Sequence, residues 1–209
     1  MPRINSVKFS EEGWLLIDES RDQRVWRDPH GDVLSLHYDK KPPDLGGPLS
    51  HMNRIRDACR VAVVSAGGAL VEVEPDEIVG LPVVRTILKF PQDPHGMSYL
   101  GVWTIPRARF RFEIRALCSE HEPTGLRDAA VWGTTQPELD EDSDDPYPGW
   151  FQDPYDPFHA APILRNKSDD EVWDAEFPDH PLSRARRHLR SVKSSLTLDA
   201  EVRDSEAFA

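Results

Sequence analysis

Two groups of residues in this chain have types and spacings that suit known site chemistry. In the first group, Asp140, Asp142 and Asp144 alternate like the opening ligands of a calcium-binding loop. The sixth position of that pattern is Asp145 instead of glycine, and the twelfth is Phe151 instead of a bidentate glutamate. Because both signature positions differ, we expect no specific calcium site.

The second group can move protons. His37 and Asp39 have the same parity on an expected strand, and His95 lies in an expected turn. Such residues act as general acids or bases when a fold brings them into one pocket, so a small hydrolase-like enzyme is one alternative. The chain contains no GxSxG, GxxxxGK[ST] or HExxH motif, and no GxGxxG motif after a strand. We therefore expect no catalytic signature, no cofactor and no metal site.

The clearest local pattern is the alternation over residues 109–115. Phe110, Phe112 and Ile114 share one parity, whereas Arg109, Arg111, Glu113 and Arg115 share the other. Successive side chains of a strand point to opposite faces, so the pattern predicts a strand with one buried face and one charged face. The charges are expected either to be solvated and paired across strands or to form a docking surface.

The remaining elements follow from periodicity and turn residues. Alternation predicts further strands over residues 14–18, 23–28, 33–38, 69–74, 83–90 and 98–105. Apolar residues at three- and four-residue spacing predict a helix that starts near Pro48 and ends at Gly67. We predict an α+β fold in which an antiparallel sheet of about six to seven strands is flanked by helices.

The chain divides into three parts on composition. Residues 1–132 contain the sheet domain, 133–162 form an acidic, aromatic and proline-rich strap, and 163–209 form a helical segment that packs on the domain. The strap aromatics are expected to lie inward across the domain. The alternative is a linear motif in which Trp150, Phe151 and Tyr155 bind a partner.

The last predicted helix is amphipathic. Asp179, followed by Pro181, predicts its start, and an apolar stripe runs through Leu182, Ala185, Leu189, Val192 and Leu196. The stripe is expected to pack on the sheet with the basic face in solvent. The alternative is a structural homodimer through the same stripe.

Composition excludes several functional classes. The net charge of −12 disfavours nucleic acid as a partner, since such binding depends on phosphate neutralisation. No apolar run is long enough to cross a membrane, and the polar start lacks the apolar stretch of a signal peptide, so we expect a cytoplasmic protein. Cys59 and Cys118 are isolated, which predicts free thiols.

Three stretches carry a resemblance to a known group. Residues 77–85 (EIVGLPVVR), residues 99–106 (YLGVWTIP) and the arginine and phenylalanine strand that follows resemble the Mog1/PsbP-like group, which includes DcrB-like and LpqN-like domains. The resemblance covers about residues 8–132. It implies an α/β/α sandwich around an antiparallel sheet and a protein that binds other proteins. It carries no catalytic residue onto this chain.

These observations favour a non-enzymatic interaction module, such as an adaptor, a chaperone-like factor or an immunity-type protein. A protein partner is expected to bind the outward face of the sheet, with help from the strap. The candidate contact residues on the sheet are Tyr99, Trp103, Arg109, Arg111 and Arg115.

Overall fold

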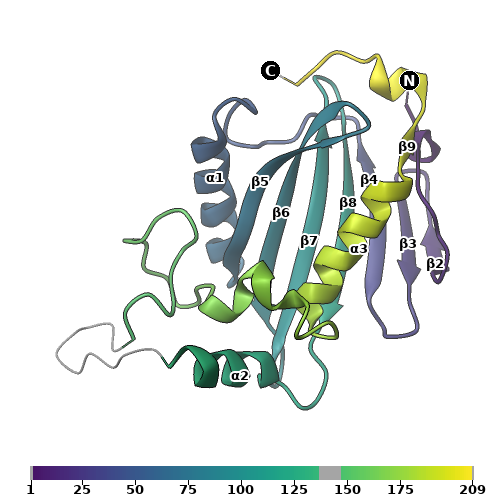
Figure 1. Ribbon diagram of the computed structural model, residues 1–209. Coiled ribbons are helices and arrows are strands. Elements are labelled where there is room, and N and C mark those ends of the chain that lie inside the picture. The colour runs from purple at the N-terminus through teal and green to yellow at the C-terminus, as the bar shows by residue number, and fades with distance from the viewer. Residues whose placement is uncertain (1, 137–146, 209) are drawn as a thin grey trace.

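A computed structural model describes residues 2–136 and 147–208 (Figure 1). Its main feature is a seven-stranded sheet in the order β2-β3-β4-β8-β7-β6-β5, in which every neighbouring pair is antiparallel. The strands are β2 (Leu15–Glu19), β3 (Gln23–Arg27), β4 (Val33–Asp39), β5 (Ala69–Ile78), β6 (Leu81–Pro91), β7 (Met97–Pro106) and β8 (Arg111–Ser119). The predicted α+β class and strand number are confirmed.

Four α-helices and three 3-10 helices accompany this sheet in the described residues. The α-helices are α1 (Met52–Ser65), α2 (Leu126–Thr135), α3 (Pro181–Ser195) and α4 (Ala200–Arg203), and the 3-10 helices are η1 (Ile4–Ser6), η2 (Lys167–Asp169) and η3 (Glu171–Asp174). Strands β1 (Val7–Lys8) and β9 (Thr197–Leu198) form a second small sheet. None of the described helices combines the length and the apolar character needed to span a membrane.

Helices α1 and α3 pack on opposite faces of the sheet. Ile87 of β6 belongs to the apolar cluster under α3, whereas the next residue, Leu88, packs into the cluster under α1. Successive strand residues point to opposite faces, so the two clusters lie on the two sides. In Figure 1, α3 crosses in front of β7 and β8, and α1 lies beside β5 at the edge of the sheet.

The apolar stripe of α3 faces the sheet, as predicted. Leu182, Ala185 and Leu189 are each at most 1% exposed. Gly101 of β7 allows this close approach, because a Cβ atom there would lie 2.8 Å from Cδ1 of Leu189. Since the stripe is covered within one chain, it is not accessible to a second copy while α3 is docked.

Two predictions about α3 are wrong in detail. Its N-cap is His180 instead of Asp179, because Nδ1 of His180 accepts from the backbone N–H of Leu182. Its basic face is not wholly in solvent, since Arg184 and Arg186 are each 5% exposed. Both arginines reach acidic residues in distant parts of the chain, which a helical pattern does not reveal.

The segment before α3 covers the edge strand β5. Tyr155 packs into the apolar cluster under α1, and its hydroxyl accepts from the backbone N–H of Val73 at 2.6 Å. Asp153 accepts from Arg60 of α1 through both carboxylate oxygens, at 2.8 and 2.9 Å. Burial opposes ionisation of Asp153, but the hydrogen bonds from Arg60 outweigh it and lower the pKa of this carboxyl. Residues 153–155 of the strap therefore pack on the folded domain.

Candidate functional site

The charged stripe of β8 lies on the face opposite α3. Arg111 and Arg115 both pair with Glu113 between them, and Arg111 also lies 2.9 Å from a carboxylate oxygen of Asp39 on β4. The side chain of Arg115 is 41% exposed and that of Arg111 is 26% exposed. The predicted pairing across strands is confirmed for Arg111, whereas Arg115 pairs within β8. These pairs hold the two guanidinium groups in place on an accessible surface.

An apolar row crosses the same face beside the charges. Leu117 continues the parity of Arg111 and Arg115, and it lies opposite Val33 on β4 and Leu100 on β7. Leu15, on the edge strand β2, lies opposite Arg27 in the same row. Leu117 is 39% exposed and Leu15 is 69% exposed. We call these side chains the open sheet face, which comprises Leu15, Arg27, Val33, Leu100, Arg111, Glu113, Arg115 and Leu117.

Tyr99 and Trp103 do not belong to this face, and their predicted outward placement is wrong. They lie opposite Cys118 and Ile114, which point toward α3. Tyr99 is 2% exposed, Trp103 is 1% exposed, and the indole N–H of Trp103 donates to the backbone carbonyl of Leu189 at 3.3 Å. Both side chains therefore contribute to the core that α3 covers.

Arg109 also departs from the predicted pattern. Strand β8 begins at Arg111, so Arg109 lies in the loop before it and not on the stripe. Its side chain is 85% exposed and lies 3.7 Å from Glu206 in the C-terminal segment. It stays accessible to a partner, but at the end of the sheet and not on the open face.

Four aromatic residues of the strap, Trp150, Phe151, Tyr155 and Phe158, separate into a buried and an exposed pair. Trp150 is 3% exposed and meets Trp132 of α2 edge to face, with ring centres 4.7 Å apart. Tyr155 faces β5. Phe151 is 50% exposed and Phe158 is 94% exposed. The inward prediction is confirmed for Trp150 and Tyr155 and is wrong for Phe151 and Phe158. The acids of the calcium-like pattern lie outside the described residues.

The histidines and the carboxylate of the enzyme alternative are not brought together. His37 and Asp39 lie opposite Glu113 and Arg111, whereas His95 precedes β7 at the other end of the sheet, where Ser98 pairs with Ser119. Ser119 follows Glu113 by six positions on β8, and six positions span about 20 Å along a strand. His95 instead contacts Glu122. The geometry therefore offers no common pocket for these three groups.

One cluster has ligand types that suit a metal ion. Asp32, Cys118 and His188 place one ligand atom each within 4.8 Å of the others. Arg184 already donates to both carboxylate oxygens of Asp32, at 2.8 and 2.9 Å, and His188 lies 3.0 Å from one of them. Burial raises the pKa of the Cys118 thiol, whereas a metal ligand must be a thiolate. The adjacent guanidinium opposes a second cation, so the cluster is a buried ion pair.

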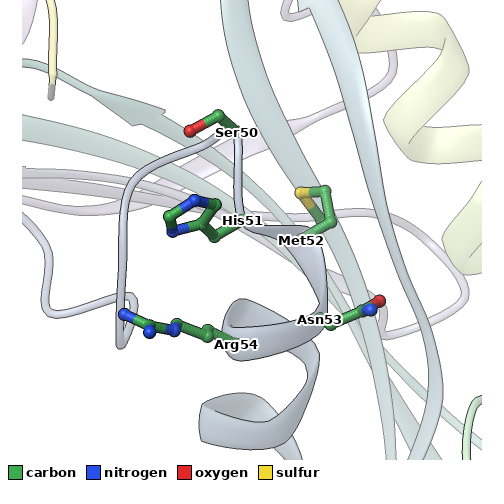
Figure 2. Close-up of a pocket in the computed structure, with 5 residues that line it drawn as sticks. All are labelled: Ser50, His51, Met52, Asn53 and Arg54. Atoms are coloured by element: carbon green, nitrogen blue, oxygen red, sulfur yellow. The ribbon is translucent and has the colours of Figure 1, made fainter.

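A shallow hollow of about 440 Å³ lies at the N-terminus of α1. Figure 2 shows its five lining residues, which are Ser50, His51, Met52, Asn53 and Arg54. The side chains of His51 and Arg54 extend to one side of the helix, and that of Asn53 extends to the other. Because the polar groups do not converge on one point, the hollow does not form a binding site.

Comparison with known proteins identifies no relative. No protein-family model matches the chain, and no curated protein matches it. Among solved structures, the chain is similar to a crystal structure from Bacteroides thetaiotaomicron VPI-5482, with 9% identity and a TM-score of 0.35 over 56% of this chain. The match spans 38% of the length of that structure. A likeness this small carries no argument, and the Mog1/PsbP-like resemblance stays a prediction.

The apolar half of the open sheet face was not predicted from the sequence. Leu117 shares the parity of the charged residues before it, which was a signal that the outward face changes from charged to apolar. Leu15, Leu16 and Ile17 are consecutive apolar residues, and such a run in an edge strand exposes at least one of them. All three are more than one third exposed in the structure.

Proposed function

We propose that this protein is an interaction module that binds a protein partner on the open sheet face. The observation that carries the proposal is the position of α3, which covers only one face of the sheet. Helix α3 packs on β7 and β8 from one side only, and Arg115 and Leu117 on the other side keep about two fifths of their surface exposed. Exposed apolar side chains grouped beside fixed charges are typical of protein-binding surfaces.

The chemistry of the face indicates the kind of partner. Leu117 and the half-buried Val33 and Leu100 form an apolar strip, and Leu15 lies beyond Arg27 at the edge of the sheet, so the partner presents an apolar ridge. Arginine is enriched among the residues that dominate binding energy, because its guanidinium combines planar packing with several donors. Arg115 lies next to the strip and is already held by Glu113, so it loses little side-chain freedom when a partner binds.

Variant capture experiments test the proposal. Leu117→Asp and a charge reversal of Arg111 and Arg115 to glutamate each alter the open sheet face. Val61→Asp is the matched control, because Val61 lies on α1 and is 67% exposed. We expect both face variants to lose a partner that the wild type and the control retain, while both variants remain folded at the temperature of the capture. Equal capture by all four proteins, or no specific partner for the wild type, would overturn the proposal.

A further inference from the structure

A cavity of about 550 Å³ lies at the end of the sheet where β4 begins and β8 ends. Four parts of the chain form it, namely the turn between β3 and β4 at His30, the segment that follows β8, the start of α2, and the turn that leads into α3. Its apolar walls include Pro123, Leu126, Phe177, Pro178 and Pro181. The volume lies within the range of pockets that bind small molecules, which are mostly apolar with a few placed polar groups.

His180 supplies the placed polar group. Its Nδ1 atom accepts from the backbone N–H of Leu182 at 3.3 Å, and its ring meets Tyr99 edge to face. Burial lowers the pKa of His180 to about 3, and Arg127 contributes in the same direction, so the imidazole is neutral at pH 7. A neutral imidazole carries one N–H, and Nδ1 is the acceptor, so Nε2 carries the hydrogen.

The Nε2–H donor has no acceptor within residues 2–136 and 147–208. His180 lines the cavity and keeps part of its surface accessible, so a molecule in the cavity can supply that acceptor. The nearby cations do not call for an anion. Arg184 is paired with Asp32 and Arg127 with Asp174, while Glu122, Glu176 and Asp179 add negative charge around the cavity.

We propose that this cavity binds a small, neutral, apolar molecule whose carbonyl oxygen accepts the hydrogen of His180 Nε2. The apolar body of the ligand lies between Leu126 and Phe177, and the hydrogen bond to His180 sets its orientation. A carboxylate analogue binds more weakly because of the acidic residues around the cavity. A purely apolar analogue binds more weakly because it offers no acceptor to the Nε2–H donor.

The test uses benzamide as the probe, with benzoate and toluene as matched analogues, followed by NMR titration of the full chain. We expect saturable shifts of the Leu126 methyl groups and the His180 ring with benzamide, and at least fivefold weaker binding of both analogues. His180→Asn keeps an acceptor for the helix cap, but its shorter amide does not place an N–H at the position of Nε2, so affinity for benzamide should fall about fivefold to tenfold.

A second variant protects the test against a folding defect. Leu126 is 59% exposed, so Leu126→Glu should fold normally while it places a charge at the cavity and abolishes benzamide binding. Val172→Glu, at a position that is 72% exposed elsewhere, should bind like the wild type. Absence of saturable shifts, equal binding of benzoate, or unchanged affinity in His180→Asn would overturn the proposal. None of these results bears on the open sheet face.

Discussion

The hydroxyl oxygen of Tyr155 lies 2.6 Å from the backbone nitrogen of Val73, on the edge strand β5. The same oxygen lies 3.0 Å from the Val73 carbonyl and 2.7 Å from a carboxylate oxygen of Glu74. One phenol therefore occupies backbone groups that an edge strand leaves free for pairing with another chain. Tyr155 of the strap therefore protects this edge of the sheet. The open sheet face, which includes Leu15 of β2, stays accessible.

Removing that hydroxyl tests the role of the strap. Tyr155→Phe keeps the ring against the Arg56 guanidinium, which lies 4.0 Å from the ring centre, but it loses the hydrogen bonds to β5. We expect the free energy of unfolding to fall by about 1 kcal/mol. Hydrogen exchange of the Val73 amide should accelerate. Phe158→Leu, at a position that is 94% exposed, is the control and should leave both measurements unchanged.

The ion pair between Lys89 of β6 and Asp169 of η2 connects the segment before α3 to the sheet, and a substitution can test its contribution. Nζ of Lys89 lies 2.7 Å from Asp169, which also accepts from Tyr99 at 2.9 Å. Lys89→Met leaves a buried carboxylate without its cation, so we expect a loss of about 3–5 kcal/mol in urea unfolding. Lys40→Met, on the surface, should cost almost nothing. A loss below about 1 kcal/mol for Lys89→Met would show that the pair is not buried as described.

His180 predicts a pH dependence of stability. Its folded pKa of about 3 lies below the ordinary value of 6.5, so between these values the unfolded chain binds more protons than the folded one. Stability from the neutral ring is therefore fully present above pH 6.5 and is lost as pH falls toward 3. The slope reaches at most about 1.4 kcal/mol per pH unit.

The measurement compares the wild type with His180→Asn. Urea unfolding at several values between pH 4 and pH 7 gives the difference in stability at each pH, and contributions from other titrating groups cancel. The wild type should lose stability relative to the variant as the pH falls. A difference that is constant with pH would contradict the buried, neutral state of His180.

Local patterns predicted the strands and helices well, because the alternation of residue types within one strand shows which of its residues share a face. The alternation from Arg111 to Arg115 placed the charges on one side of β8 correctly. The same pattern does not say which residues of a neighbouring strand share that side. Trp103 lies opposite Ile114, so the register between β7 and β8 decides which face of the sheet Trp103 occupies. Its outward placement was predicted wrongly for this reason.

The buried charges were beyond prediction for a different reason. Arg184 looked like part of a solvated helix face, but it pairs with Asp32, 152 residues earlier in the chain. A helical period shows which residues share a side, not which distant residue neutralises one of them. The cavity at His180 was not predicted for the same reason, because four separate segments form it.

The most direct test of the open sheet face is hydroxyl-radical footprinting of this protein alone and in its purified complex with a captured partner. We predict that Leu15 and Leu117 lose reactivity in the complex, because both are exposed in the free protein. Val61 on α1 should react equally in both states. Unchanged reactivity at Leu117, together with shielding at Val61 or Leu126, would place the partner elsewhere and contradict the proposal.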